Sequence, residues 1–481
     1  MKLSGEITLA SGFIFDYSNM LNTHTITAEA IEALESKAAD AADALMLIRE
    51  QGTAKAHLSK DGTPEHVFFT KLPFIQAGNP NTPESIAKLK QFGSYLQQKI
   101  DAVVFLGVGG SYLGNKVLFD IFAGSGWNVG CEKSRQGYPR VYFSGNNLDV
   151  DQYGEVINEL EYLATHRLGK NEPFRVLLVP ISKSGTTLET LAAFSYFYEQ
   201  CQKSSLLQME VAVVTDLDED ISPLYKLAKE QGWHCFDIKE GIGGRFCIFS
   251  DPGLITAAAI GMDIDAFLRG AKDMENACQS ASLGENPALL NAVLKYAAAE
   301  KGVDIEVFMP YAAKMKSVGE WYVQLLAESL GKRKDREGNV VYYGRTPVSA
   351  VGSTDMHAQT QQHQDGKKDK VIQFIEILER KQQIVLNNSF THISALKKYD
   401  GLSVDHALKI ALAANEEALT SDGRLNAKYI LPRIDEYYLG QLLYFLMLSV
   451  AYEGELADVD AYDQPGVETY KHIMKQKMSQ Q

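Results

Sequence analysis

The chain has 481 residues, which is enough for two or three domains with a large buried core. Apolar residues make up 45% of it and charged residues 22%, as in ordinary soluble globular proteins. The formal net charge of −14 argues against nucleic acid or an anionic membrane surface as the main partner, and any anionic ligand would need a locally positive pocket.

Cysteine usage and the N-terminal sequence bear on the compartment. The five cysteines are odd in number and lack C-x-x-C spacing, so neither a disulfide framework nor a structural zinc site is expected. Residues 1–20 lack the basic and apolar regions of a signal peptide. The most apolar stretch, 437–452, is interrupted by Gly440 and Gln441, which favours a buried helix over a membrane span. We therefore expect a cytoplasmic protein without a membrane partner.

Apolar runs alternate with helical patterns from the first hundred residues onward. An Ala-rich helix is predicted over 27–50, within an N-terminal helical arm that we place at 1–83. A first α/β domain is predicted at 84–252. It opens with a helix at 84–100, and its strands are expected at 102–108, 140–145, 174–181 and 210–216. Strands that alternate with helices in this way predict a parallel sheet covered on both faces.

A second series of strands follows a predicted helical connection at 253–302. We place a second α/β domain at 303–455, with strands at 304–310, 346–352, 370–378 and 427–432. The highly charged segment 331–344 is predicted to be a solvated loop, and 456–481 to carry a C-terminal helix. Two tandem α/β domains flanked by terminal segments are the simplest organisation of the chain.

Two loops of the first domain suit an anion. The turn "GVGGSYLGNK" (107–116) follows a strand, but it lacks the last glycine of a dinucleotide fingerprint and the G-K-[ST] ending of a P-loop. In "ISKSGTTLET" (181–190), hydroxyl groups cluster where a strand turns into a helix, and the helix dipole favours a phosphate there. Thr186 and Glu189 also match a capping box, which explains part of this motif without a ligand. Both loops should lie at the carboxyl edge of one sheet, which predicts a small phosphorylated ligand across them.

Candidate acid–base groups occur later in the chain. Glu328 lies on the largely apolar face of a predicted helix, in its last turn, and such surroundings suit a general base. His357 lies in the first turn of another predicted helix, where the helix dipole favours a neutral imidazole. The structural alternatives are an ion pair between Glu328 and Lys332 and an ordinary polar role for His357.

Three further positions could complete a site. Arg245 lies in the glycine-rich turn "GIGGRF", where a guanidinium could stabilise an oxyanion or pair with a neighbouring acid. Gln464 and Lys471 are seven residues apart, which predicts one shared face of a last helix. A lysine so near the end of a chain is more commonly just solvated.

Together the motifs resemble the phosphoglucose isomerase family. The matching stretches, in the family's order over roughly residues 100–475, are "GVGGSYLG", "SKSGTTLET", "GGRF", "WYVQLLAESLGK", "STDMHAQTQQHQ", "NEEALTSDGR" and "DQPGVETYK". The resemblance implies two tandem sugar-isomerase (SIS) domains, each a parallel sheet flanked by helices, with an N-terminal helical segment and a C-terminal helical arm. It also implies reversible aldose–ketose isomerisation of glucose 6-phosphate to fructose 6-phosphate in glycolysis and gluconeogenesis, with no metal and no organic cofactor.

The resemblance further implies a role for each site residue. His357 and Lys471 would open the sugar ring, Glu328 would move a proton between C2 and C1 through a cis-enediol, and Arg245 would stabilise the enediolate. His357 would come from the partner subunit of a homodimer. The remaining candidates would bind the substrate: Gly110, Ser111, Ser182, Lys183, Ser184, Thr186, Thr187 and Gln464.

Three alternative hypotheses fit parts of the sequence. A related isomerase could also accept mannose 6-phosphate, because the phosphate loops do not distinguish epimers at C2. A non-catalytic sugar-phosphate sensor would be expected to lack Glu328, His357 or Lys471, and all three are present. A nucleotide-dependent dehydrogenase or kinase is disfavoured by the incomplete dinucleotide and P-loop patterns.

Overall fold

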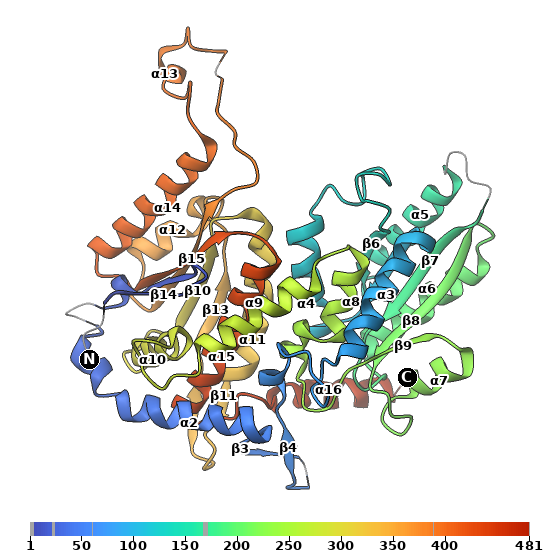
Figure 1. Cartoon of the computed structure of the whole chain (residues 1–481), viewed down its shortest axis with the longest axis horizontal. Coiled ribbons are helices and arrows are strands. Elements are labelled where there is room, and N and C mark those ends of the chain that lie inside the picture. The colour runs from blue at the N-terminus through green and yellow to red at the C-terminus, as the bar shows by residue number, and fades with distance from the viewer. Residues whose placement is uncertain (1–3, 22–24, 60, 167–171, 388, 481) are drawn as a thin grey trace. The chain divides into compact units, whose positions relative to one another are not determined.

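Parallel β-sheets covered by helices form the framework of both halves of the chain. The computed structural model describes residues 4–21, 25–59, 61–166, 172–387 and 389–480. The chain divides into two compact units (Figure 1). The first unit comprises Ile48–Ala54 and Leu58–Arg269, and the second comprises Met1–Leu47, Lys55–His57 and Gly270–Gln481.

The first unit contains a five-stranded sheet in the order β6-β5-β7-β8-β9, and all of its strand pairs are parallel. The direction of chain progression reverses between β5 and β7, because the chain goes from β5 to one neighbour and then crosses to the other side. The two central strands are almost wholly buried, as expected for strands covered on both faces. The strands are β5 (Ala102–Leu106), β6 (Arg140–Ser144), β7 (Phe174–Pro180), β8 (Leu207–Thr215) and β9 (His234–Asp237).

Helices connect these strands and cover the sheet. The helix that leads into β5 begins with a capping box between Thr82 and Ser85 and with Pro83 at its first position, which fixes its start. The helices are α3 (Pro83–Lys99), α4 (Gly110–Leu118), the π-helix η3 (Phe119–Ala123), α5 (Val150–Thr165), α6 (Leu188–Lys203), α7 (Pro223–Gln231), the 3₁₀ helix η4 (Gly244–Phe249) and α8 (Asp251–Ala259). Helix α9 (Ile264–Ala277) begins in this unit, and its residues from Gly270 onward belong to the second. Before them come β3 (Thr53–Leu58), β4 (Pro64–His66) and the 3₁₀ helix η2 (Phe69–Lys71).

The second unit contains a six-stranded sheet in the order β1-β2-β15-β14-β10-β13. Four of its strands are parallel, whereas β2 runs antiparallel to β15, and β1 runs antiparallel to β2. The strands are β1 (Glu6–Thr8), β2 (Ile14–Asp16), β10 (Ile305–Pro310), β13 (Thr346–Ser349), β14 (Lys370–Glu379) and β15 (Asn426–Arg433). The N-terminal strands β1 and β2 therefore extend the edge of this sheet. The sequence-based prediction of a helical arm at 1–83 does not include these strands.

Side chains of the second sheet alternate between two helical layers. Val307 and Phe374 pack with Leu412 of α14, whereas Phe308 points the other way, with its ring centroid 5.0 Å from that of Tyr322 in α11. Figure 1 shows α12 beside α14, and α10 beside α15. The helices are η1 (Ser18–Met20), α1 (Ala28–Glu32), α2 (Glu35–Gln51), α10 (Pro287–Ala299), η5 (Ala313–Met315), α11 (Lys316–Leu330), α12 (Met356–Asp365), α13 (Ser394–Lys397), α14 (Val404–Ser421), α15 (Glu436–Leu456) and α16 (Gly466–Met478).

The mixed α/β fold with helix-flanked parallel sheets is confirmed, and every strand predicted in the two series is present. The apolar stretch 437–452 lies in α15, which is buried almost throughout, as predicted. Of the helices in the described residues, none is both long and apolar enough to cross a bilayer. The segment 331–344 is largely exposed, as predicted, but it is not a loop throughout. It forms a hairpin of β11 (Lys332–Lys334) and β12 (Val340–Tyr343), in which Lys332 is buried.

Candidate active site

The first glycine-rich loop is shaped by the close approach of two backbones. Gly109 precedes α4 with a φ of 58°, a conformation that favours glycine. Gly110 is the first residue of α4, and a Cβ atom there would lie 2.0 Å from the carbonyl oxygen of Gly244. The loop therefore packs directly on η4, and the Cys247 thiol donates to the Gly110 carbonyl at 3.4 Å.

The close approach of Gly110 and Gly244 also holds Arg245 beside this loop. It is the second residue of η4, directly after Gly244, and only 2% of its surface is exposed. Its guanidinium carbon lies 5.4 Å from the centroid of the Phe246 ring. The glycine-rich segment is present after β9, but Arg245 lies in η4 and not in a turn as predicted. This position places a buried cation next to the backbone of Gly110.

The second loop carries its hydroxyl groups in two bonded pairs. The hydroxyl groups of Ser182 and Thr187 lie 2.8 Å apart, and those of Ser184 and Thr186 lie 2.9 Å apart. Ser182 is buried, whereas Lys183, Ser184 and Thr186 are exposed. Exposed hydroxyl and ammonium groups before a helix N-terminus are donors suited to phosphate oxygens.

The predicted capping box in the second loop is wrong. Helix α6 begins at Leu188 with Thr187 as its N-cap, and that cap makes no side-chain hydrogen bond. The Thr186 hydroxyl instead bonds to Ser184, and Ser184 Oγ accepts from the Thr186 N–H at 3.3 Å. Capping of α6 by Thr186 therefore does not explain these hydroxyl groups.

The two loops follow neighbouring strands. Leu106 at the end of β5 pairs with Pro180 at the end of β7, so Gly110, Ser111 and Ser182–Thr187 belong to one edge of the first sheet. These are also the strands between which chain progression reverses. In open parallel sheets, ligands bind at the carboxyl edge at this point of reversal. The first unit thus combines a glycine-rich loop and a hydroxyl-rich loop at one edge of its sheet, with Arg245 beside the glycine-rich loop.

Glu328 lies in the last turn of α11, as predicted. Its Oε1 accepts a hydrogen bond from the Gln324 side chain at 3.0 Å, and its side chain is half-buried. Gln324 Oε1 is buried and has no hydrogen-bond partner within the described chain. The sequence places Gln324 on the same helix face but gives it no role. The i, i+4 spacing of two polar residues on an apolar face is the signal that could have found it.

Glu328 and His357 lie toward opposite edges of the second sheet. Helix α11 follows the carboxyl end of β10, and Tyr322 bonds to Glu306, the second residue of that strand. Glu328 lies almost two turns beyond Tyr322 and thus on the amino side of the sheet. His357 is exposed, in the first turn of α12, which follows the carboxyl end of β13. One copy of this unit does not bring the two side chains together.

The predicted shared face of Gln464 and Lys471 is wrong. Helix α16 begins at Gly466 with Pro465 as its N-cap, so Gln464 lies outside the helix and the seven-residue helical spacing does not apply. Lys471 lies on α16 and pairs with Glu468 at 3.3 Å. The residue before Gln464, Asp463, contacts Lys332, which lies two residues after the end of α11. Gln464 therefore lies toward the same side of the unit as the end of α11.

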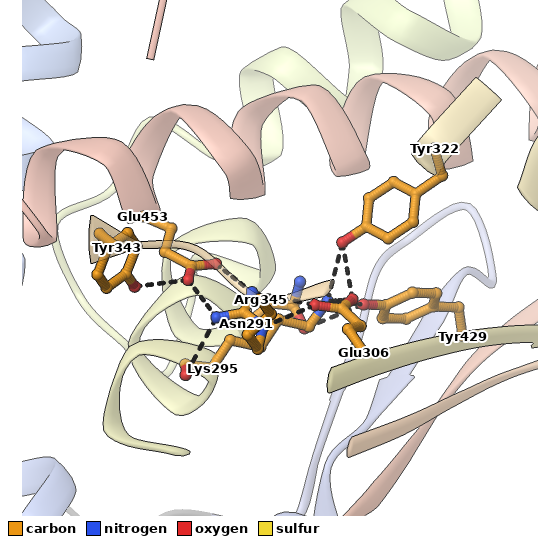
Figure 2. Close-up of polar contacts among 8 residues, drawn as sticks. All are labelled: Asn291, Lys295, Glu306, Tyr322, Tyr343, Arg345, Tyr429 and Glu453. Carbon is orange, nitrogen blue, oxygen red and sulfur yellow. Dashed lines mark hydrogen bonds and ion pairs between the residues drawn. The ribbon is translucent and has the colours of Figure 1, made fainter. Parts of the chain in front are cut away.

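A buried cluster of charges anchors α11 (Figure 2). It contains two cations and two carboxylates, each with at most 2% of its side chain exposed: Lys295, Arg345, Glu306 and Glu453. Lys295 and Arg345 both donate to Glu306, and the Tyr322 hydroxyl of α11 donates to the same carboxylate at 2.8 Å. Burial would raise the pKa of Glu306, but the two cations outweigh it and lower that pKa below its usual range. Helix α11 is thus tied to the sheet through a fully paired network.

Comparison with known proteins gives a consistent result. The family model described as phosphoglucose isomerase matches residues 86–481. A glucose-6-phosphate isomerase from Carboxydothermus hydrogenoformans is 34% identical over 403 residues, which cover 84% of this chain and 83% of that protein. A glucose-6-phosphate isomerase from Clostridioides difficile is 32% identical over 407 residues, covering 84% of this chain and 86% of that protein.

Two solved structures share the fold over nearly the whole chain. A hypothetical protein from Thermus thermophilus superposes with a TM-score of 0.77 at 27% identity, over 94% of this chain and 96% of that one. A glucose-6-phosphate isomerase from Chlamydia trachomatis superposes with a TM-score of 0.78 at 22% identity, over 99% of this chain and 90% of that one.

Proposed function

This chain is an isomerase of the phosphoglucose isomerase family, and from that premise we propose that it interconverts glucose 6-phosphate and fructose 6-phosphate. The observation that carries the proposal is the meeting of the glycine-rich loop and the hydroxyl-rich loop at the reversal point of the first sheet. Curated relatives more than 30% identical over most of the chain carry the name of this activity. We also propose that this reaction serves glycolysis and gluconeogenesis and that the protein is cytoplasmic. The domain boundaries given in the sequence analysis stay a prediction.

In this proposal, the first unit holds the phosphate. Ser184 and Thr186 offer exposed hydroxyl groups, Lys183 offers a positive charge, and the N-terminus of α6 adds its dipole. Ser182 and Thr187 support the loop from behind through their mutual hydrogen bond. The first loop lies against the neighbouring strand end, where Gly110 and Ser111 would line the same pocket.

Replacing Ser184 by Ala should weaken substrate binding more than turnover. The hydroxyl would bond to the phosphate equally in the ground state and the transition state, so we expect KM to rise by about tenfold and kcat to change little. Steady-state kinetics with fructose 6-phosphate measure both constants. Ser204→Ala, at the other end of α6, is the matched control. An unchanged KM for Ser184→Ala would contradict a phosphate-binding role.

The second unit would supply most of the proton chemistry. His357 and Lys471 would move the proton of the ring oxygen during ring opening. Glu328 would then take the acidic proton at C2 and return it at C1, passing through a cis-enediol, because a C–H group next to a carbonyl is acidic enough for a positioned carboxylate. Arg245, a buried cation of the first unit, would stabilise the enediolate charge, and Gln464 would contact the sugar. No step of this scheme needs a metal or an organic cofactor.

A homodimer is part of the proposal, because the site would need His357 from the partner subunit. The location of Glu328 and His357 toward opposite edges of one sheet supports this assignment, since one chain would have to bring together groups separated by the depth of the sheet. A symmetric dimer would form two such sites, each with Glu328 from one copy and His357 from the other.

Subunit mixing tests the shared site. Glu328→Gln and His357→Asn homodimers should each be almost inactive. Random exchange makes half of the dimers mixed, and each mixed dimer has one intact site out of two, so we expect about a quarter of wild-type activity to return. Co-expression with two affinity tags isolates the mixed dimers. If purified mixed dimers stay inactive, the two residues act within one chain.

A coupled assay tests the proposed reaction itself. Purified protein is given fructose 6-phosphate without added metal, and glucose 6-phosphate is followed through an added dehydrogenase. Mannose 6-phosphate formation is measured in parallel. Rapid production of glucose 6-phosphate supports the proposal. Tight binding of fructose 6-phosphate without turnover would point instead to a sugar-phosphate sensor.

A further inference from the structure

The β11–β12 hairpin lies along an acidic segment of the same unit. The hairpin begins one residue after the C-cap of α11, and its first strand and its turn carry lysines and arginines, namely Lys332, Arg333, Lys334 and Arg336. The segment 453–463, "EGELADVDAYD", contains the end of α15 and the chain that leads toward α16, and it has acidic but no basic residues. Opposite charges therefore face each other between two stretches that are far apart in the sequence.

Arg336 makes the central contact between the hairpin and the acidic segment. Its guanidinium donates two hydrogen bonds to the Glu455 carboxylate, at 2.5 and 2.6 Å, and the two side chains are 3% and 4% exposed. The Arg336 backbone N–H donates to the carbonyl of Asp458 at 2.8 Å. At the base of the hairpin, where Tyr343 pairs with Lys332, the Tyr343 hydroxyl donates to Glu453 at 2.7 Å, which joins the hairpin to the buried charge cluster of Figure 2.

Lys332 makes the last contact, next to two of the candidate site residues. Its ammonium donates at 2.6 Å to both the backbone carbonyl and the carboxylate of Asp463. Lys332 comes four residues after Glu328, and Asp463 directly precedes Gln464. The Lys332 side chain is only 5% exposed, whereas that of Asp463 is 42% exposed. The ammonium is therefore shielded from water, and its second bond, to the Asp463 backbone carbonyl, does not depend on the exposed carboxylate.

The segment after Asp463 has little burial of its own. Within the described chain, α16 contains no buried residue, and Gln464 and Pro465 are exposed. A helix of its length is marginal in water without tertiary contacts. Upstream of Asp463, the segment is held again by Asp460, whose carboxylate contacts the buried His57 ring at 2.9 Å. The path of the chain into α16 is therefore set by contacts made before Gln464, namely these charged pairs and the buried side chains of Val459 and Ala461.

We propose that the β11–β12 hairpin is a brace that fixes Gln464 and α16, and hence Lys471, relative to Glu328. Lys332 and Asp463 are its positioning residues, and neither is assigned a contact with the substrate. The proposal rests on the proposed function for the catalytic part of its argument. A misplacement of about 1 Å at a reacting group can lower a rate by about 100-fold, so a brace of this kind acts on kcat.

The test compares Lys332→Met with Lys332→Arg, Asp463→Asn and the double variant Lys332→Met/Asp463→Asn. Lys334→Met is the matched control, because Lys334 lies in the same strand and is exposed. For Lys332→Met we expect kcat to fall by about 10- to 100-fold, with KM for fructose 6-phosphate within threefold of wild type. Lys332→Arg should recover most of the rate. The double variant should be no slower than Lys332→Met, since the two single substitutions remove the same contact between residues 332 and 463.

Amide hydrogen exchange of residues 464–480 provides a second measurement that does not depend on activity. We expect at least tenfold faster exchange in Lys332→Met than in wild type or Lys334→Met, with unchanged exchange in β10 and β14. Asp463→Asn removes only the charge of the carboxylate and keeps the shape of the side chain and the backbone acceptor. The same exchange measurement can therefore be made on Asp463→Asn if Lys332→Met does not fold.

The outcomes separate the brace from the proposed reaction. Faster exchange over 464–480 supports the brace even if the wild-type protein shows no isomerase activity, a result that would sink only the proposed function. Unchanged exchange, or a kcat within twofold of wild type in an active enzyme, would overturn the brace. A uniform loss of stability without rescue by Lys332→Arg would reduce Lys332 to an ordinary buried cation and would also overturn it.

Discussion

Glu328→Gln should lower kcat for fructose 6-phosphate by about 10²–10⁴-fold while leaving KM nearly unchanged. The amide keeps the size of the side chain and can still contact Gln324, which now bonds to the carboxylate at 3.0 Å. What it removes is the capacity to accept a proton from carbon. The coupled assay measures turnover, and calorimetric titration with the sugar phosphate measures whether binding persists.

The control for this variant lies on the same helix. Glu320→Gln changes a half-exposed carboxylate of α11 that pairs with Lys316, so it alters the charge of the helix without touching its last turn. We expect nearly wild-type turnover from it. If Glu328→Gln retained more than a tenth of wild-type kcat, Glu328 would not be the base, and the proton transfer would have to be assigned to another group.

Lys295→Met should reduce the free energy of unfolding by about 3–5 kcal/mol. The substitution removes one of four balanced charges in a cluster that water does not reach, and it leaves the carboxylates of Glu306 and Glu453 with only the Arg345 guanidinium. Few single substitutions of a buried side chain are expected to cost more. Urea unfolding followed by circular dichroism measures the loss.

A second substitution distinguishes charge balance from packing. In Lys295→Met/Glu306→Gln the cluster is neutral again, so the double variant should be less destabilised than the sum of the two single variants. Lys301→Met, at an exposed position just after α10, is the control and should change stability by less than about 0.5 kcal/mol. Simple additivity of the two buried substitutions would show that the network is not coupled.

Burial explains which elements could be predicted from the sequence. The strands β5 and β7 are covered on both faces, so they appear as unbroken apolar runs such as "AVVFL", and their prediction is confirmed. The short strands β1, β2, β11 and β12 are partly exposed and pair antiparallel with distant or charged segments. Nothing in the local pattern of "GKRKDREG" reveals that Arg336 is buried against Glu455, because the partner lies more than a hundred residues away.

The candidate site was predictable in part for similar reasons. Spacing along a helix places Glu328 in the last turn of α11, and the position of His357 in a first turn follows from the polar start of its helix. Spacing failed where a helix boundary was shifted. Pro465 is an N-cap rather than a helical residue, so Gln464 falls outside α16. Thr187, not Thr186, precedes α6, because the Thr186 hydroxyl bonds to Ser184 instead.

The buried charge cluster also restricts how this sequence can drift over evolutionary time. A single exchange at Lys295, Glu306, Arg345 or Glu453 would consume much of the 5–15 kcal/mol that typically holds a folded protein together. Two compensating exchanges, one cation and one carboxylate together, would cost far less. Among relatives, these four positions should therefore be kept, or be replaced in pairs of one cation and one carboxylate. Such correlated substitutions would reveal the network in an alignment, whereas one sequence alone does not.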